Sequence, residues 1–129
     1  MGMFIAGKVV KMMIQKGTNI KGAKALLLGV TFKENCPDIR NSKVVDIYNE
    51  LVQFGLEVDV FDPHADAVQV QSEYNIQLIP SPTKYDAIIL TVAHNEFLQL
   101  DLNALKNGNH TVIFDSKAAL DRGSVDARL

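Results

Sequence analysis

The 129-residue sequence predicts an α/β fold in which helices cover both faces of a five-stranded parallel sheet. Two observations support this prediction. A short, continuously apolar run at 25–30 and a largely apolar segment at 86–92 are typical of strands that are buried on both faces of a parallel sheet. Between such runs lie segments whose apolar residues recur every three or four positions, as they do along helices. Strands that alternate with helices favour right-handed crossovers and therefore a three-layer, Rossmann-like (flavodoxin-like) sandwich.

The chain starts with a predicted helix over residues 3–16. Its apolar side chains recur at helical spacing, and Gly17 ends it. Because few residues precede this helix, we interpret it as the last part of a longer helix that comes from a preceding domain. We therefore expect the end of an interdomain helix at 1–20 and one domain at 21–129.

The next elements follow the same alternation. A strand that begins near Lys24 leads into a polar loop at 31–41. A predicted helix follows at 42–54, with Ser42 as its N-cap. The second strand, at 57–61, ends where an Asp-Pro pair stops it.

The second half of the chain is predicted to hold, in order, a helix at 65–74, a weak edge strand at 76–79, a central strand at 86–92, one or two short helical turns at 95–107 and a last strand at 111–115. Numbered along the chain, the five strands are expected in the spatial order 3-2-1-4-5. The crossovers between these parallel strands are expected to be right-handed.

Composition narrows the classes of partner. The formal net charge is −2, which argues against nucleic acid because phosphate backbones select for clustered Lys and Arg. The single cysteine, Cys36, allows no internal disulfide, so a cytoplasmic setting is expected. No apolar run reaches the roughly 20 residues of a membrane span. The N-terminal stretch is also unlike a secretory signal, since it is interrupted by Lys8, Lys11 and Lys16.

The loop after the first strand is the candidate ligand site. In an open parallel sheet, ligands bind beyond the carboxyl ends of the strands where the strand order reverses, here between strands 1 and 4. The loop carries Lys33, Asp38 and Arg40 ahead of a helix N-terminus. Two cations beside free backbone N–H groups suit a phosphate. On spacing alone, solvated loop charges or a structural Arg40–Asp38 pair explain the pattern equally well.

This loop is not a dinucleotide-binding fingerprint. It holds one glycine instead of the G-x-G-x-x-G pattern, and that pattern occurs nowhere else in the chain. We therefore expect that the chain does not bind NAD on its own, despite its Rossmann-like architecture.

Three motifs follow one another in the first half of the chain: LGVTFK at 28–33, DIRNS at 38–42 and VDVFDP at 58–63. In this order and spacing they resemble the C-terminal, UDP-binding domain of the UDP-glucose/GDP-mannose dehydrogenase family. The pattern of that family is G-x-x-F-K, then D-x-R-x-S, a helix, and a strand that ends in an aromatic residue followed by Asp-Pro. The resemblance extends over nearly the whole chain, and the segment at 1–6 resembles the end of the long helix that joins the two domains of the family.

Features near the C-terminus narrow the resemblance to one branch of the family. Members that act on N-acetylated UDP-sugars tend to have an Asp-x-Lys segment and a terminal Arg-Leu, which correspond here to 115–117 and 128–129. The segment at 92–97 is similar too. The resemblance therefore favours bacterial UDP-N-acetylglucosamine or UDP-N-acetylgalactosamine 6-dehydrogenases. UDP-glucose dehydrogenases more often carry arginines near Lys117, whereas here Ala118 follows it.

The resemblance also implies a division of labour. The parent enzyme is expected to use NAD, held mainly by an N-terminal domain, to oxidise a UDP-hexose to the UDP-uronic acid for capsule or surface polysaccharide. Its catalytic cysteine, which passes through a thiohemiacetal and a thioester in two hydride transfers, is expected upstream, so this chain supplies no catalytic residue. Phe32, Lys33 and Lys117 are expected to bind the UDP-sugar. Arg40 is expected to reach NAD across the cleft between the domains.

The other reactive side chains are expected to be structural. Cys36 has no histidine nearby in the sequence that could activate it. His64 and His110 are expected at the surface, and His94, at the end of a strand, is a weaker candidate for the site. Three histidines this dispersed predict no metal site.

Two other functions are compatible with parts of the sequence. A freestanding nucleotide-binding or receiver domain is one, but a receiver needs an aspartate at the end of the central strand, and the first strand ends in Gly29-Val30-Thr31. A dimerisation module without catalysis is the other. Since the interdomain helix of the family packs between subunits, a homodimer is compatible with ligand binding. The parent gene should run about 300 residues further upstream, two domain lengths, if the enzyme interpretation holds.

Overall fold

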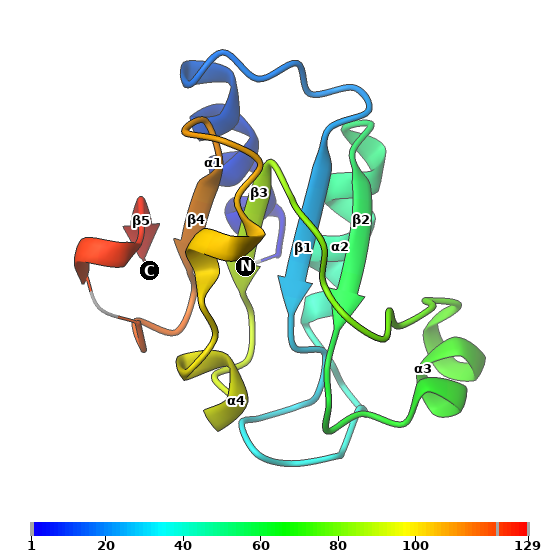
Figure 1. Ribbon diagram of the computed structural model, residues 1–129. Helices are drawn as coiled ribbons and strands as arrows, with labels where there is room; N and C mark the ends of the chain where they lie inside the picture. Colours follow the sequence, from blue (N-terminus) through cyan, green and yellow to red (C-terminus); the bar gives the residue numbers. More distant parts are fainter. Residues whose placement is uncertain (1, 121, 129) are drawn as a thin grey trace.

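A computed structural model of the chain describes residues 2–120 and 122–128. At its centre is a parallel sheet in the strand order β2-β1-β3-β4-β5 (Figure 1). The strands are β1 Lys24–Leu28, β2 Glu57–Phe61, β3 Ala87–Leu90, β4 Val112–Asp115 and β5 Ala127–Arg128. The predicted order of the four longer strands is confirmed. Leu129 of the Arg-Leu ending, like Met1 of the N-terminal segment, lies outside the described residues.

The sheet differs from the prediction at the edge next to β2. The edge strand predicted at 76–79 is wrong, because only Leu78 forms a bridge, to Val60 of β2. The segment remains where the predicted order put it, but it cannot extend the ladder. Pro80 and Pro82 follow it directly and have no N–H to donate.

A two-residue strand, β5, borders β4 at the opposite edge. It follows a 3₁₀ turn, η2 (Arg122–Ser124), and is preceded by Asp126. The carboxylate of Asp126 accepts a hydrogen bond from the Ile113 N–H at 2.7 Å and one from Lys16 Nζ at 2.7 Å. Periodicity does not detect a strand of two residues. The sheet thus has four strands of four or five residues and this short additional one.

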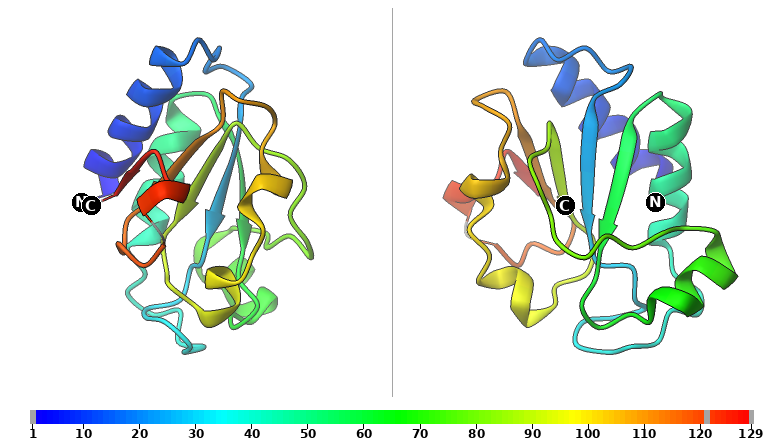
Figure 2. Two further views of the ribbon diagram at one scale, coloured as in Figure 1. Left: turned by 60° about the vertical axis from the view of Figure 1, so that its left-hand side comes forward. Right: turned by 45° about the vertical axis from the view of Figure 1, so that its right-hand side comes forward.

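One face of the sheet is covered by two helices, α1 (Gly2–Gln15) and α2 (Val44–Gln53), which pack against each other (Figure 2). Strand residues such as Leu27 and Ile89 point to this face, since successive side chains of a strand point to opposite sides. Helix α1 adds the buried side chains of Ile5, Ala6, Val9, Val10 and Met13 to the same core. The helix predicted at 3–16 is confirmed.

The other face of the sheet has a thinner cover. The four-residue helix α4 (Asn95–Leu98) places Phe97 on the sheet, and the 3₁₀ turn η1 (Leu102–Leu105) places Leu102 there. The short helical turns predicted at 95–107 are confirmed. They pack on the strand residues Leu26, Leu28, Ile88, Leu90 and Ile113. None of the helices described is long and apolar enough to cross a membrane.

Helix α3 (Ala67–Tyr74) lies beyond β2, next to the loop that follows β1 (Figure 1). Asp66 caps it by accepting hydrogen bonds from two backbone N–H groups of the first turn, and Asn75, in the left-handed conformation, ends it. Its last residue, Tyr74, donates from its hydroxyl to the carbonyl of Ile39 at 2.5 Å. This contact ties α3 to the loop after β1.

Helix α2 begins two residues later than predicted. Ser42 is not its N-cap: Lys43 holds that position and makes no side-chain cap bond. The backbone N–H of Ser42 donates to the Tyr74 hydroxyl at 3.4 Å, and Asn41 before it has a φ of +56°. The chain is therefore still held against α3 at Ser42 and has not turned into the helix. Among the described residues, the Ser42 Oγ has no hydrogen-bond partner.

Candidate functional site

The carboxyl ends of β1 and β3 are adjacent, and the loops that follow them leave toward opposite faces of the sheet (Figure 1). Leu28 and Leu90 end the two strands side by side. The loop at 29–43 leads to α2 on one face, and the loop at 91–94 leads to α4 on the other. The predicted reversal of strand order between these strands is confirmed, and such a reversal is where ligands bind in open parallel sheets.

Thr91 joins the two strands where their loops separate. Its Oγ1 lies 2.8 Å from the carbonyl oxygen of Leu28 and 2.6 Å from that of Gly29. The hydroxyl is buried, so this contact is shielded from water. It fixes the starting point of the loop after β1.

Asp62 anchors the next part of the same loop from the end of β2. Its Oδ2 accepts hydrogen bonds from the backbone N–H groups of Val30 at 2.7 Å and Thr31 at 3.2 Å. Its Oδ1 accepts one from the His64 N–H at 2.8 Å. The side chain of Asp62 is fully buried. A buried carboxylate with this many donors holds the backbone of the loop firmly, since breaking the set would leave a buried charge unpaired.

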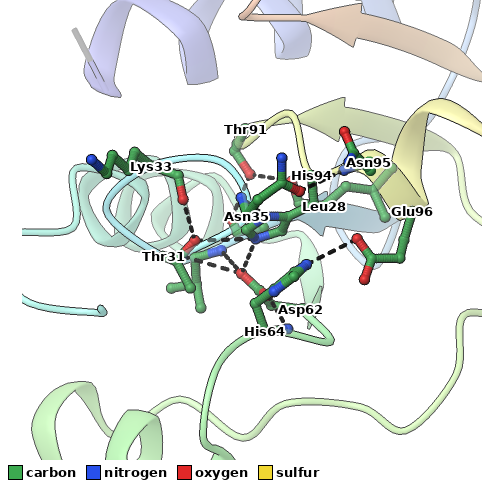
Figure 3. Close-up of polar contacts among 12 residues, drawn as sticks. Leu28, Thr31, Lys33, Asn35, Asp62, His64, Thr91, His94, Asn95 and Glu96 are labelled. Atoms are coloured by element: carbon green, nitrogen blue, oxygen red, sulfur yellow. Dashed lines mark hydrogen bonds and ion pairs between the residues drawn. The ribbon is translucent and has the colours of Figure 1, made fainter. Parts of the chain in front are cut away.

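His94, from the end of the β3 loop, completes the polar cluster (Figure 3). Its Nε2 lies 3.1 Å from Asp62 Oδ2 and 3.1 Å from Thr31 Oγ1, and its Nδ1 accepts the Asn35 N–H at 2.8 Å. The imidazole has no exposed surface. Its ring lies 4.3 Å from that of His64, measured between centroids.

His64 extends the cluster to the surface. Its Nε2 lies 2.9 Å from Glu96 Oε1, and the hydrogen bond from His64 lowers the pKa of Glu96. His64 was expected at the surface, and its side chain is 26% exposed. Among the described residues, no group of three or more His, Cys, Asp or Glu side chains could hold a metal ion.

Phe32 and Lys33 lie on the outer side of this loop. The Phe32 ring is 56% exposed, although its backbone N–H donates to the Asp38 carbonyl at 2.6 Å. The side chain of Lys33 is exposed and extends away from the His94 cluster (Figure 3). Its carbonyl oxygen accepts the hydroxyl of Thr31 at 3.0 Å. Both side chains thus face solvent, while hydrogen bonds with Thr31 and Asp38 hold their backbone.

Arg40 and Asp38 form a two-pronged ion pair at the far end of the loop. Arg40 Nε donates to Asp38 Oδ1 at 3.0 Å and Nη2 donates to Oδ2 at 3.0 Å. These side-chain hydrogen bonds lower the pKa of Asp38 to about 2 and raise that of Arg40. Phe32, Asp38, Arg40 and Asn41 line one shallow pocket of about 320 Å³. The structural Arg40–Asp38 pair that the spacing left open is present, and the guanidinium remains largely exposed.

Lys117 also lies beyond the carboxyl end of a strand, but that strand is β4, two strands away from β1. The buried carboxylate of Asp115 caps the turn after β4 by accepting the N–H groups of Lys117 at 2.9 Å and Leu120 at 2.6 Å. The side chain of Lys117 is exposed. The structure therefore brings Phe32, Lys33 and Arg40 onto one loop and leaves Lys117 on a separate one.

Cys36 sits on this loop next to Asn35, and its side chain is partly exposed. The nearest histidine along the hydrogen-bond network is His94, which uses both ring nitrogens on other partners. The imidazole of His94 is therefore not free to deprotonate the thiol.

Sequence reasoning missed the supporting cluster formed by Thr31, Asp62 and His94. Each of these residues follows a predicted strand within a few positions, and the carboxyl ends of parallel strands meet at one edge. Polar residues shortly after the strands that became β1, β2 and β3 include all three. Asp62 was considered as the residue that stops its strand and as part of the 58–63 motif, and His94 as a weaker candidate for the site, but neither was linked to the loop after β1.

A doubly wound domain that carries an exposed basic loop at its switch point is typical of nucleotide-binding α/β proteins. The chain belongs to the UDP-glucose/GDP-mannose dehydrogenase family: the model of the UDP binding domain of that family matches residues 26–122. The resemblance predicted from the three motifs is confirmed.

Two curated relatives are similar over the whole chain. The UDP-N-acetyl-D-glucosamine 6-dehydrogenase of Pseudomonas aeruginosa is 43% identical over 134 aligned residues, which cover 100% of this chain and 32% of that protein. The enzyme of the same name from Salmonella typhi is 41% identical, covering 100% of this chain and 31% of that protein. The chain thus spans about a third of the length of these relatives.

Solved structures share the fold. The UDP-N-acetyl-mannosamine dehydrogenase Cap5O from S. aureus superposes with a TM-score of 0.73 at 24% identity, over 98% of this chain and 29% of that one. The UDP-D-ManNAc dehydrogenase from Pyrococcus horikoshii superposes with a TM-score of 0.77 at 19% identity, over 98% of this chain and 30% of that one. In both cases the chain corresponds to one part of a larger protein.

Proposed function

We propose that this chain is the UDP-sugar-binding domain of an NAD-dependent dehydrogenase that oxidises C6 of a UDP-N-acetylhexosamine to the carboxylate, for capsule or surface polysaccharide. The observation that carries the proposal is the loop after β1: Phe32, Lys33 and Arg40 are exposed on a fixed backbone, in a chain of this family. The preference for an N-acetylated sugar is supported by the two whole-chain relatives, which are named as UDP-N-acetyl-D-glucosamine 6-dehydrogenases.

The roles of the loop residues follow from their chemistry. Lys33 offers a mobile ammonium that can meet a phosphate or sugar oxygen of the UDP-sugar, and Phe32 offers an exposed ring against which a ligand can pack. Lys117, on the loop after β4, provides a second cation at the same edge for the sugar end of the ligand. All three act in binding, and none is positioned to transfer a proton in the reaction.

Among the described residues, the fit to NAD is limited to one contact with a cofactor that another domain holds. The loop after β1 has no second or third glycine to admit a pyrophosphate, whereas Arg40 has an exposed guanidinium that can reach a phosphate held by another domain. Two molecules of NAD, bound in succession and held mainly by an N-terminal domain, would each accept one hydride. Asp38 orients the guanidinium of Arg40 through both of its oxygens.

The N-terminal helix supports the domain arrangement and the assembly that we propose. We place the end of an interdomain helix at 1–20 and the UDP-sugar-binding domain at 21–129. Helix α1 buries one side in the core but leaves Phe4 and Ile14 each 58% exposed, a feature that favours packing against a second subunit. We propose a homodimer on this ground, and a cytoplasmic location on the ground of the single cysteine. Sedimentation equilibrium at increasing concentration tests the dimer.

The test of the function is a calorimetric titration of the 129-residue chain with UDP, with GDP as the matched control, followed by turnover of the full-length enzyme with NAD. UDP is expected to bind and GDP to bind more weakly. NADH formation is expected to be fastest with UDP-N-acetylglucosamine or UDP-N-acetylgalactosamine and slower with UDP-glucose. Equal binding of UDP and GDP, or preference for UDP-glucose, would contradict the nucleotide or the sugar part of the proposal respectively.

A further inference from the structure

We propose that His94 is the positioning residue of the substrate loop, by which we mean residues 31–35 of the loop after β1, because its imidazole holds this backbone and so places Phe32 and Lys33. This inference rests on the proposed UDP-sugar function of that loop. His94 itself touches no ligand: it is buried beneath the loop and acts through Thr31 and Asn35.

The hydrogen-bond network assigns a role to each ring nitrogen of His94. Because the Asn35 N–H donates to Nδ1, that nitrogen carries no proton, so the proton of the neutral ring is on Nε2. Nε2–H then points to Asp62 Oδ2 and Thr31 Oγ1, each at 3.1 Å. The Thr31 hydroxyl is thereby free to donate to the carbonyl of Lys33 at 3.0 Å.

These bonds hold the loop at both ends and in the middle. Thr31 is held at the start, the Lys33 carbonyl at the centre, and the Asn35 N–H at the end (Figure 3). Asn35 adds a second link, since its Oδ1 accepts the N–H of Asn95 at 3.0 Å. A loop held in this way needs little further ordering when a ligand binds, which improves affinity without adding a contact.

The imidazole suits this position for a geometric reason. It carries an acceptor and a donor on different edges of one rigid ring, so it can serve Asn35 and Thr31 together. The ring is kept in its plane by contacts with His64, 4.3 Å away between centroids, and with Phe97, 5.3 Å away. An asparagine amide reaches only the position of Nδ1, where its oxygen can accept from Asn35, and a glutamine amide reaches only the position of Nε2, where its NH2 can donate to Thr31.

The test is steady-state kinetics of the full-length dehydrogenase with three variants. His94→Phe keeps the ring shape and loses both hydrogen-bonding edges, so the KM for the UDP-sugar is expected to rise by roughly ten-fold or more, with the KM for NAD unchanged. His94→Asn keeps an acceptor for Asn35 and is expected to recover part of the loss. His94→Gln keeps a donor for Thr31 and is expected to recover another part.

A role in stability alone gives a different result, because loss of folded enzyme lowers the apparent kcat and leaves both KM values unchanged. His110→Phe is the matched control: His110 also bonds a carboxylate, Asp86 at 2.7 Å, but at the amino ends of the strands. It is expected to leave the KM for the UDP-sugar unchanged. Should His94→Phe fail to fold, Thr31→Val cuts the same connection from the other side and is expected to raise the same KM.

Three outcomes overturn the inference: an unchanged KM for the UDP-sugar in His94→Phe, an unchanged KM in Thr31→Val, or no recovery in His94→Asn. If the wild-type enzyme uses no UDP-sugar at all, the proposed function fails instead. Amide hydrogen exchange at Asn35, which needs no ligand, then decides the positioning role. Exchange is expected to become faster in His94→Phe, and an unchanged rate overturns the inference.

Discussion

Val92 occupies the space in which a side chain of Gly29 would lie. A Cβ added to Gly29 would be 2.5 Å from the Val92 Cβ and 3.0 Å from the Val92 backbone nitrogen, and Gly29 has a φ of +108°. The loops after β1 and β3 therefore approach each other closely at Gly29 and Val92. Only a residue without a Cβ permits both the close approach and this backbone conformation.

Replacing Gly29 by alanine is therefore expected to destabilise the domain by about 2–4 kcal/mol, as strained backbone and overpacking add. Gly17→Ala is the control, because Gly17 also has a positive φ, +86°, but has no atom within 4 Å of an added Cβ. It should lose only the strain part, about 1–2 kcal/mol. Urea unfolding of both variants measures the difference, and equal losses would show that the contact with Val92 is unimportant.

Changing Cys36 to serine is expected to leave the turnover rate of the full-length enzyme within a few-fold of wild type. The thiol lies on the loop after β1, but the imidazole of His94 uses both of its nitrogens on Asn35, Thr31 and Asp62. Rate measurements before and after alkylation of the thiol provide a second check. Complete inactivation of Cys36→Ser with the fold intact would identify Cys36 as the nucleophile.

The sequence predicted those parts of the fold that have a long local signal. The apolar runs at 25–30 and 86–92 became β1 and β3, which lie at the centre of the sheet, and the helical spacing at 3–16 became α1. The prediction failed at the two edges of the sheet, because the pairing there depends on few residues. The segment at 76–79 forms one bridge before its prolines, and the strand at 127–128 has two residues.

The location of the site could be predicted from the sequence, but the hydrogen bonds that hold its loop could not. The position of the loop follows from strand order, and its charged residues can be read directly from the sequence. The contacts of His94 with Asp62 and Thr31 join residues 32 and 63 positions apart, and both depend on the folded sheet edge. No local pattern records such a contact. The late start of α2 was hidden for the same reason, since it depends on Tyr74, which is 32 positions from Ser42.

The carboxylate of Asp38 is expected to titrate far below its ordinary range. Hydrogen bonds from Arg40 lower its pKa from 3.8 to about 2 in the folded chain. Because the folded pKa is the lower one, the stabilisation from this pair is fully present above pH 3.8 and is lost as the pH falls toward about 2. Carboxyl NMR should show this midpoint in the wild type and a return toward the ordinary value in Arg40→Ala. Arg122→Ala, a control on the η2 turn, should leave the midpoint of Asp38 in place.

The 129-residue chain alone is expected to have no dehydrogenase activity and no measurable affinity for NAD. The reason is that the loop at its switch point lacks the glycine fingerprint, so a pyrophosphate cannot approach the backbone, and Arg40 offers only one contact. Calorimetry with NAD and a turnover assay with each UDP-sugar measure the two properties. NADH formation by the isolated chain would show that the division of labour is wrong.

Lys33 is expected to be the residue of this domain whose loss weakens UDP-sugar binding most. It is exposed on the loop beyond β1, and its backbone is fixed through Thr31, so its ammonium is presented at the switch point. Removing a charge-assisted hydrogen bond costs about 1.5–3 kcal/mol, or roughly ten- to a hundred-fold in affinity. In the full-length enzyme, Lys33→Ala should weaken UDP-sugar binding by that factor and leave NAD binding nearly unchanged.

Arg40→Ala should do the reverse, since its guanidinium is the group that we place on the cofactor side. Lys84→Ala serves as the control and should change neither affinity, because Lys84 lies just before β3, at the amino ends of the strands. Each variant is titrated with one ligand at a time. If Lys33→Ala binds the UDP-sugar as tightly as wild type does, Lys33 is a solvated surface lysine, and the phosphate is bound elsewhere along the carboxyl ends of the strands.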